Sequence, residues 1–383
     1  MSGRGETFDA GVIGGGIIGC ATAWELARRG LRVVLLERDR LAAGASGAAA
    51  GMLAAQSEAQ GPGAWLDLLL RARDGWAPRA DELRTETGID VEYQCGGVLR
   101  VAANAEEQAE LVARAAWQRA LGLEAQWLTA GEARRQEPAL SPDVAGALWA
   151  PLEAQVRPAR AVQALGAAAA SKGVAVREGQ AVYGLLRAGR RVSGLSTSAG
   201  TIHCGVVVAA AGAWSGWLRE LASLPLGPVK GQIVAAQAPP NNGPRHIVWG
   251  RGAYITPKAS GDVFIGATEE EGVFDTRPTL GALAGLVTRA GQLVPSVNCW
   301  PLLSSWAGLR PALPDRLPVL AASPDLEGLY VATGHYRNGI LLGPLTGRLM
   351  AQLVTGEATD VDLAPYSLTR ATLPAGTEGR TAA

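Results

Sequence analysis

The sequence predicts a mixed α/β (α+β) fold in which a discontinuous Rossmann-type domain is interrupted by a second domain built on an antiparallel sheet. Three observations lead to this prediction. A strand–glycine–helix–strand unit opens the chain at residues 8–37, and a strand–glycine–helix unit returns at residues 328–354. Between them, residues 228–300 hold short apolar segments separated by Pro, Gly, Asn and Asp, a pattern typical of antiparallel sheets. The two outer units are therefore expected to form one domain around an inserted one.

The opening unit has the local features of a dinucleotide-binding βαβ fold. Its strand, helix and second strand are expected at residues 8–13, 17–29 and 32–36. The turn before the helix has the spacing G-x-G-x-x-G, formed by Gly14, Gly16 and Gly19. The first glycine makes the tight turn, the second lets a pyrophosphate approach the backbone, and the third allows close helix–strand packing. Glu37 ends the second strand and is placed to bind both adenosine ribose hydroxyls, which argues against NADP.

Composition argues against several classes of protein. Lys plus Arg and Asp plus Glu are both 35 among 383 residues, so no net charge attracts nucleic acid or an acidic membrane surface. No apolar run approaches the ~20 residues that span a bilayer, and the N-terminus lacks the apolar segment of a signal peptide, so a cytoplasmic protein is expected. Four scattered cysteines and three histidines predict no metal site and disfavour a histidine-based hydrolase.

Domain boundaries are expected where the pattern changes along the chain. The cofactor-binding domain is assigned to residues 1–88, 145–222 and 304–370. The inserted substrate-binding domain is assigned to residues 89–144 and 223–303, and a disordered tail to residues 371–383. Helices are expected at residues 65–88, 106–121 and 156–173. A strand is expected at residues 96–102, and an apolar strand followed by a small-residue turn at residues 205–215.

The cofactor and substrate are indicated by a resemblance that runs from residue 12 to residue 347. It is carried, in order, by "VIGGGIIG", "LLER", "SGAAAGML", "VVVAAAGAWS", "AYITPK" followed by "FIGAT", "WAGLRP" and "TGHYRNGILLGPLTG". Together these stretches resemble the D-amino-acid oxidase family of flavoproteins, most closely its glycine oxidase branch, which is associated with thiamine biosynthesis. The last two stretches are distinctive, whereas the first alone leaves NAD and FAD as alternatives.

The resemblance implies non-covalently bound FAD. Carried over by position, the phosphate and ribose contacts would come from Gly14, Gly16, Ile17, Ile18, Gly19, Leu36 and Glu37. Further contacts would come from Gly44, Ala45, Ala49, Ala50, Gly51, Val182 and Gly212. The flavin ring would be closed over by His335, Tyr336, Arg337, Asn338, Gly339, Ile340 and Leu341. A helix that begins near Gly339 would direct its positive end at the flavin, where reduction places negative charge.

Four side chains are predicted to form the substrate end: Arg310, Arg337, Tyr254 and Glu269. Arg310 stands among apolar and small residues, where an unpaired cation is costly, and a planar guanidinium suits a carboxylate. Arg310 is expected to be the main carboxylate ligand, Arg337 a second one and Tyr254 a further donor, although ion pairs within the protein are the alternative for both arginines. Glu269 replaces the apolar residue usual in this branch, and it either faces the pocket or points into solvent.

The implied reaction is oxidative deamination of glycine and other small amines, including sarcosine and small D-amino acids. Hydride would pass from the α-carbon to flavin N5 without a catalytic general base, giving an imine, which hydrolyses to an oxo acid and ammonia, and hydrogen peroxide from molecular oxygen. The resemblance also implies thiamine thiazole biosynthesis and a homo-oligomer. The alternatives are an FAD-dependent D-amino-acid dehydrogenase with a non-oxygen acceptor, an NAD-dependent dehydrogenase, and a flavin-bound regulatory protein without turnover.

Overall fold

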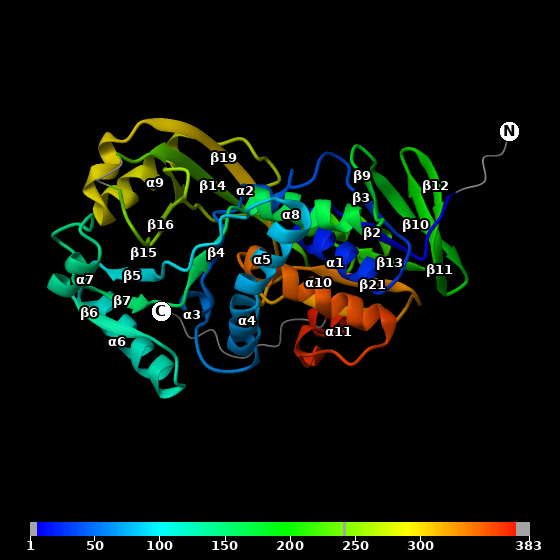
Figure 1. The fold of residues 1–383 in the computed structure, drawn as a ribbon, viewed down its shortest axis with the longest axis horizontal. Helices are drawn as coiled ribbons and strands as arrows, with labels where there is room; N and C mark the ends of the chain where they lie inside the picture. The colour runs from blue at the N-terminus through cyan, green and yellow to red at the C-terminus, as the bar shows by residue number, and fades with distance from the viewer. Residues whose placement is uncertain (1–5, 240–242, 373–383) are drawn as a thin grey trace.

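The computed structural model describes residues 6–239 and 243–372. Together these residues form two lobes side by side, and the chain passes between the lobes several times (Figure 1). The first lobe is built on a six-stranded sheet in the order β20-β21-β13-β2-β3-β9. Its strands are β2 (Ala10–Ile13), β3 (Val33–Leu36), β9 (Ala175–Arg177), β13 (Val206–Ala209), β20 (Val319–Ala322) and β21 (Leu329–Thr333). Neighbouring strands are parallel except for β20 and β21. The N-terminal and C-terminal units therefore share one sheet, as the sequence predicts.

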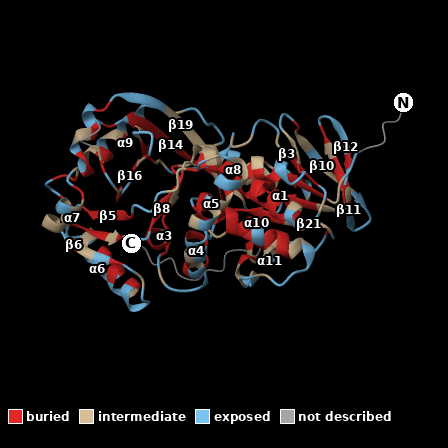
Figure 2. Ribbon diagram, in the orientation of Figure 1, coloured by how far each residue is buried: buried red, intermediate tan, exposed pale blue. Residues whose placement is uncertain are grey.

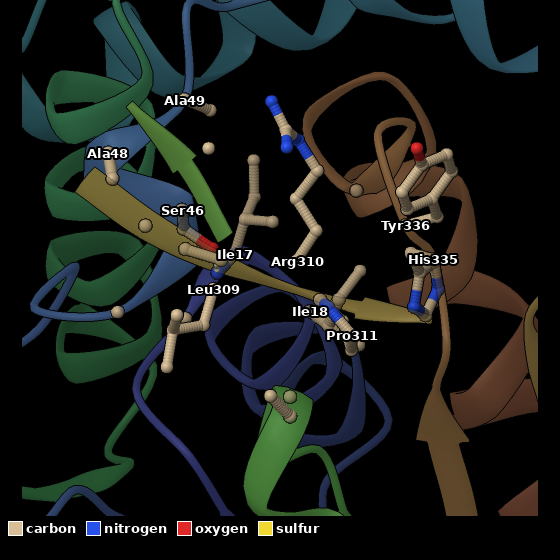
Figure 3. A pocket seen from close by; sticks show the side chains of 18 of the residues that line it. Ile17, Ile18, Ser46, Ala48, Ala49, Leu309, Arg310, Pro311, His335 and Tyr336 are labelled. Carbon is tan, nitrogen blue, oxygen red and sulfur yellow. Dashed lines mark hydrogen bonds between the residues drawn. The ribbon is translucent and has the colours of Figure 1, made fainter. Parts of the chain in front are cut away.

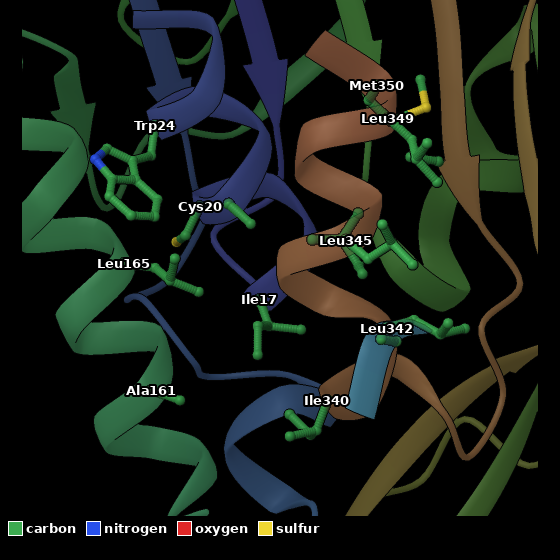
Figure 4. Packing of buried hydrophobic residues seen from close by; sticks show 14 of the residues in the cluster. Ile17, Cys20, Trp24, Ala161, Leu165, Ile340, Leu342, Leu345, Leu349 and Met350 are labelled. Carbon is green, nitrogen blue, oxygen red and sulfur yellow. The ribbon is translucent and has the colours of Figure 1, made fainter. Parts of the chain in front are cut away.

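Helices cover one face of this sheet. They are α1 (Ile17–Arg28), α8 (Pro158–Ser171) and α10 (Gly339–Thr355), with α4 (Ala64–Asp74) and α5 (Trp76–Thr87) packed against them. Figure 4 shows α1 between α8 and α10, with Ile17 directed into the space between the helices. Helix α10 approaches α1 closely because Gly347 has no side chain, and a Cβ there would lie 2.6 Å from the carbonyl carbon of Ala21. This packing fixes the start of α1 relative to the start of α10.

A four-stranded sheet covers the opposite face. Its order is β1-β12-β11-β10, formed by β1 (Glu6–Thr7), β10 (Val182–Ala188), β11 (Arg191–Thr197) and β12 (Gly200–His203). Because side chains alternate along a strand, Val34 and Leu36 of β3 pack toward this sheet, whereas Val33 and Leu35 pack toward the helices. Figure 2 shows the resulting concentration of buried residues in the layered lobe.

The second lobe is built on a nine-stranded sheet. Eight strands follow the order β18-β14-β17-β16-β15-β5-β7-β6, and β19 pairs with β14. The strands are β5 (Val98–Ala102), β6 (Gln126–Thr129), β7 (Gly146–Ala150), β14 (Gly227–Gln237), β15 (Ile247–Gly250), β16 (Ala253–Pro257), β17 (Asp262–Gly266), β18 (Glu270–Glu271) and β19 (Leu302–Ala312). All these pairs are antiparallel except β15 with β5. The predicted fold class is confirmed.

Short elements join the lobes, and helices complete the second one. The second lobe carries α6 (Ala105–Ala120), α7 (Ala130–Gln136) and α9 (Leu280–Leu293). The connection contains α2 (Ala45–Ala48), α3 (Ala55–Glu58) and a two-stranded sheet of β4 (Met52–Leu53) and β8 (Ala154–Gln155). The chain described here ends in α11 (Leu368–Thr372). The connecting elements bring small residues and one acidic side chain, Glu58, between the lobes.

Several elements differ from the predictions. The single helix expected at residues 65–88 is divided at Gly75, which ends α4 and begins α5. Pro78, in the first turn of α5, has no N–H to continue the helical hydrogen bonds across this point. Helix α9 lies in a region predicted to hold only strands and turns, and it buries Leu286, Ala290 and Leu293 at helical spacing. The glycines and alanines between these positions gave the region a loop-like composition.

The two sheets also divide the chain at other places than the expected domain boundaries. Strands β7 and β19 pair within the larger sheet, although residues 145–222 and 304–370 were assigned to the cofactor-binding domain. Strand β19 is followed directly by β20, which belongs to the six-stranded sheet of the first lobe. The boundary predicted from sequence therefore fell a few residues too early, inside β19. Of the predicted tail, residues 371–372 finish α11, and residues 373–383 lie outside the described residues.

Candidate active site

A cavity of about 1400 Å³ lies between the lobes, at the carboxyl ends of β2, β3 and β13. This is the edge of a Rossmann-type sheet at which ligands bind. Residues of both lobes line it, with contributions from α1, α2, the turn after β13, β14, β16, β19 and the segment before α10. Figure 3 shows Arg310 projecting from β19 into this space, on the side where His335 and Tyr336 lie.

The glycine turn forms one wall. Gly14 has a φ of +110°, and a Cβ there would lie 2.5 Å from the carbonyl oxygen of Ala210. A Cβ on Gly19 would lie only 1.8 Å from the carbonyl oxygen of Gly14, so this position accepts no side chain. Helix α1 begins after Gly16, which has no side chain to cap it, and the first amide, that of Ile17, donates to the Ser46 hydroxyl at 3.0 Å. Gly16, Ile17 and Ser46 all line the cavity, so the positive end of the helix dipole lies at this wall.

The acid at the end of β3 is fixed by backbone amides. One carboxylate oxygen of Glu37 accepts a hydrogen bond from the Gly15 amide at 2.7 Å, and the other accepts one from the Asp39 amide at 2.9 Å. Beside it, the Arg38 guanidinium lies 4.1 Å from the ring centre of Trp214, within cation–π distance. This end of the cavity therefore combines a fixed carboxylate, that of Glu37, with the aromatic ring of Trp214.

The small-residue segment before β4 lies against the cavity and is held from behind by a lysine. Lys258 is buried, and its ammonium donates to the Ala50 carbonyl at 2.5 Å and to Gln155 Oε1 at 2.8 Å. Burial lowers the pKa of Lys258 to about 7. Gly51 has a φ of +86°, and a Cβ there would lie 2.1 Å from the Val156 carbonyl oxygen, so the backbone passes here with no room for a side chain.

A second helix N-terminus also meets the cavity. Helix α10 begins after Asn338 without a side-chain cap, and Asn338, Gly339 and Ile340 line the space. His335 precedes it in a fully buried position, where burial lowers the pKa to about 3, so the imidazole is neutral. One His335 ring nitrogen lies 3.1 Å from the hydroxyl of Thr346. The segment is thus fixed by the helix that it begins.

Arg310 and Tyr254 approach each other at the other end of the cavity. Arg310 Nη1 donates to the Thr268 carbonyl at 3.0 Å. Its guanidinium lies over Gly231 of β14, where a Cβ would be 2.3 Å from a terminal nitrogen, so the cation needs this glycine. Burial raises the pKa of Tyr254 to about 12, although Arg310 acts to lower it, and the phenol remains a hydrogen-bond donor. No carboxylate pairs with Arg310 within residues 6–239 and 243–372.

Arg337 is held differently. Its Nη2 lies 2.9 Å from Glu58 Oε2, and its Nη1 lies 2.9 Å from Glu269 Oε1. Burial lowers the pKa of Arg337, but the two carboxylates outweigh burial and the pKa is raised. Its guanidinium also lies 5.7 Å from the ring centre of Trp249. The two arginines of this end therefore differ, because one is free of carboxylates and the other binds two.

Glu58 is in turn positioned by a buried acid. The side chain of Glu153 accepts hydrogen bonds from the Gln56 amide at 2.5 Å and the Ser57 hydroxyl at 2.6 Å, both within α3. Burial raises the pKa of Glu153 to about 7 even though both hydrogen bonds favour its charged form. Since α3 has only four residues, these bonds fix the orientation in which it presents Glu58.

Nearly all the predicted site residues line the cavity. The exceptions are Gly19, which packs against Gly14, and Leu341, whose carbonyl accepts a hydrogen bond from the Trp76 indole at 2.9 Å. Sequence reasoning missed several lining residues: Ser46, Glu58, Ala210, Ala211, Trp214, Trp249, Phe274 and Arg289. Some of these lie inside the quoted motifs, which was a usable signal. Glu58 had none, since its partner Arg337 is 279 positions away.

The lining fits a dinucleotide. The N-termini of α1 and α10 line the cavity, which suits anionic groups, and a fixed acid follows β3, where such folds bind a ribose. Within the described part of the chain, no group of three or more His, Cys, Asp or Glu is arranged to hold a metal ion. In the same residues, no helix has the length and apolar character needed to cross a membrane.

Known proteins share this fold and most of this sequence. The family described as DAO, FAD dependent oxidoreductase, matches residues 9–353. The glycine oxidase of Geobacillus kaustophilus (strain HTA426) is 42% identical over 366 residues, covering 95% of this chain and 97% of that protein. Its crystal structure has a TM-score of 0.92 at 41% identity, covering 95% of this chain and 99% of that chain.

A second relative is longer than this chain. The bifunctional protein ThiO/ThiG of Nostoc sp. (strain PCC 7120) is 36% identical over 375 residues, covering 97% of this chain and 56% of that protein. With the family matched over most of its length and a close relative covered almost completely, the chain belongs to the DAO family and is an FAD-dependent oxidoreductase.

Proposed function

We propose that the protein oxidises glycine and other small amines, such as sarcosine and small D-amino acids, with oxygen as the electron acceptor. The observation that carries this proposal is Arg310, a guanidinium that faces the cavity without a carboxylate partner among the described residues. Such a cation is a ready ligand for the carboxylate of an amino acid. The glycine oxidase named among the relatives supports this choice of substrate class.

The cofactor would be held without a covalent bond and mainly by backbone. When bound, FAD would supply the acceptor for the hydride and would pass the electrons on to oxygen. Gly14, Gly16 and the first turn of α1 would hold the pyrophosphate, and Glu37 the ribose. The small-residue segment 44–51 and the start of α10 would lie along the rest of the molecule, where both line the cavity.

The substrate would be oriented chiefly by Arg310 and Tyr254. The Arg310 fork would bind the carboxylate, and the neutral Tyr254 phenol would donate a further hydrogen bond to it. The positive charge of Arg310 favours the neutral form of a nearby amine, from which hydride can leave the α-carbon without a general base. The products would be an imine, hydrolysed to an oxo acid and ammonia, and hydrogen peroxide.

Arg337 was predicted to be a second carboxylate ligand. Its two terminal nitrogens are paired with Glu58 and Glu269, so we now assign the substrate carboxylate to Arg310 alone. Glu269 was predicted either to face the pocket or to point into solvent. It lines the cavity and is half exposed there, so it is a candidate for contact with the far side of a substrate.

The biological setting is proposed from the relatives. The name ThiO/ThiG of the Nostoc relative supports a role of the product imine in thiamine thiazole biosynthesis. We keep a homo-oligomer and a cytoplasmic location as further proposals. The alternative function is an FAD-dependent D-amino-acid dehydrogenase that passes electrons to an acceptor other than oxygen.

The stoichiometry of products tests this function. The purified holoenzyme is incubated with glycine in air, and glyoxylate, ammonia and hydrogen peroxide are quantified against oxygen consumed. Equal amounts of all four are expected of an oxidase. If glyoxylate forms only when a quinone or dye is added, with no peroxide, the dehydrogenase alternative is correct. If no glyoxylate forms under either condition, glycine is not the substrate.

A further inference from the structure

The ion pairs of Arg337 with its two carboxylates differ in strength. The side chain of Glu58 is 9% exposed and is fixed through α3, whereas that of Glu269 is 47% exposed. A buried charge is costly to leave unpaired, so Arg337 and Glu58 stay together. A half-exposed ion pair contributes little to stability and is screened by solvent. Glu269 is therefore the partner that a mutation can remove while the Arg337–Glu58 pair stays in place.

Arg337 Nη1 donates to Glu269, and an arginine N–H of this kind also binds the carboxylate of a ligand. Arg310 and Arg337 both line the cavity and both act electrostatically on Tyr254 and on Tyr336, so the two guanidinium groups lie at the same end of it. Without Glu269, Arg337 would offer a free N–H donor there while keeping its charge balanced by Glu58. With Glu269 in place, the donor is occupied and a negative charge meets any second carboxylate.

We propose that Glu269 restricts the enzyme to substrates with one carboxylate, by occupying the donor of Arg337 that would otherwise bind the second carboxylate of an iminodiacetate-like amine. This inference rests on the proposed function, since it assumes that Arg310 binds the first carboxylate. It also explains why an acid at the edge of the pocket is compatible with an anionic substrate. The Glu269 carboxylate is paired with Arg337, which leaves Arg310 available to the carboxylate of the substrate.

The test uses inert ligands, so that binding is measured apart from turnover. Methoxyacetate has the shape of sarcosine with one carboxylate, and diglycolate has the shape of iminodiacetate with two, and both carry an ether oxygen in place of the amine. Dissociation constants for the FAD-loaded enzyme are measured from the change in flavin absorbance. The variants are Glu269→Gln, Glu271→Gln as a matched loss of charge on a residue that pairs with Arg316, and Glu269→Gln combined with Arg337→Lys.

The proposal predicts a selective change. In Glu269→Gln, the affinity for diglycolate relative to methoxyacetate rises about tenfold, the worth of one charge-assisted hydrogen bond. Glu271→Gln leaves the ratio near the wild-type value. Adding Arg337→Lys, which keeps a charge for Glu58 but lacks the second arm, removes most of the gain.

Two results would overturn the inference. One is an unchanged ratio in Glu269→Gln, and the other is an equal rise in Glu271→Gln, which would mean that net charge alone selects the ligand. In both of these cases methoxyacetate still binds and the proposed function stands. If the wild-type enzyme binds neither ligand, the carboxylate site on Arg310 is itself wrong, and the proposed function fails together with the inference.

Discussion

The two ends of the cavity are built in different ways. The end proposed for the cofactor consists mainly of backbone groups, namely the glycine turn, the first turns of α1 and α10, and the small-residue segment 44–51. The end proposed for the substrate consists of charged side chains from α3, β19, the segment after β17 and the turn before α10. Among these, Arg337 is paired with Glu58 and Glu269, whereas Arg310 is bonded to a backbone carbonyl. The first end is defined by the absence of side chains and the second by their charges.

This difference has a physical consequence. Where backbone meets backbone, one added methyl group has nowhere to go, so binding is expected to fail abruptly. Where side chains balance one another, a single change shifts an electrostatic equilibrium and selects another ligand. Cofactor affinity should thus respond to steric changes, and substrate preference to charge changes. The predictions below test this division.

The largest effect is expected at the glycine turn. In Gly19→Ala, the new methyl group would lie 1.8 Å from the carbonyl oxygen of Gly14, so the turn must open. We expect FAD affinity to fall about 100-fold, because a contact this short with backbone falls at the upper end of the usual cost of overpacking, ~3 kcal/mol. Flavin fluorescence on titrating apoprotein with FAD measures it. Gly205→Ala, with no atom within 4 Å of the new Cβ, is the control. Normal affinity in Gly19→Ala would contradict the steric account.

Removal of the free guanidinium is expected to act on the substrate alone. Arg310→Ala should lower kcat/KM for glycine by about 2–4 kcal/mol, roughly 30- to 1000-fold, since hydrogen bonds to charged groups contribute ~1.5–3 kcal/mol each. FAD content should stay at the wild-type level. Arg289→Ala, which removes a cavity-lining arginine bonded to the Gly252 carbonyl, should change kcat/KM little. An unchanged kcat/KM in Arg310→Ala would remove Arg310 from the site.

The buried acid behind α3 should make stability depend on pH. Because the pKa of Glu153 is raised from 4.5 to about 7, the folded chain binds its proton more tightly than the unfolded chain. The contribution of Glu153 to the free energy of unfolding is therefore fully present below pH 4.5 and is lost as pH rises through about 7. The loss is on the order of 3 kcal/mol.

Glu153→Gln separates this effect from other titrating groups. Urea denaturation at several pH values should show the free energy of unfolding of the wild type falling relative to the variant between pH 4.5 and 7. The exposed carboxylate of Glu106 gives a matched control in Glu106→Gln. Parallel pH profiles for wild type and Glu153→Gln would contradict the assignment.

The most gradual effect is expected in the pH dependence of catalysis. If the amine reacts in its neutral form, kcat/KM for glycine should rise up to about tenfold per unit from about pH 6 toward pH 9, as one proton is lost. Steady-state oxygen consumption at each pH measures kcat/KM. As a control, enzyme held at each pH is returned to one common pH and its activity is measured again, which shows that it has not been inactivated. A flat profile would mean that a group of the protein takes the amine proton.

The layered fold was predictable because its signals are local. The G-x-G-x-x-G spacing, the apolar strands and the terminal acid Glu37 all lie within about thirty residues, and their physics depends little on the rest of the chain. Helix α9 was missed because its buried residues, Leu286, Ala290 and Leu293, are diluted by glycine and alanine. Helix α9 forms because this buried face packs on the sheet of the second lobe. That tertiary contact cannot be read from the local composition.

The substrate end was predictable only in part. Arg310 stood out because an arginine among apolar residues needs a reason, and that signal is local. The pairing of Arg337 with Glu58 and Glu269 was not, since it depends on α3, which reaches the cavity through the lobe connection and is fixed by Glu153. A residue whose role is set by a partner far along the chain has no sequence signature of its own.

The central claim is that the cavity binds an amino acid by its carboxylate beside FAD, so that hydride can leave the α-carbon. It is tested most directly by adding glycine to the FAD-loaded protein without oxygen and following the flavin absorbance near roughly 450 nm. Reduction of the flavin by two electrons bleaches this absorbance. The account predicts bleaching in the wild type, rapid recovery when air is admitted, and much slower bleaching in Arg310→Ala. An unbleached flavin with glycine, sarcosine and D-alanine alike would contradict it.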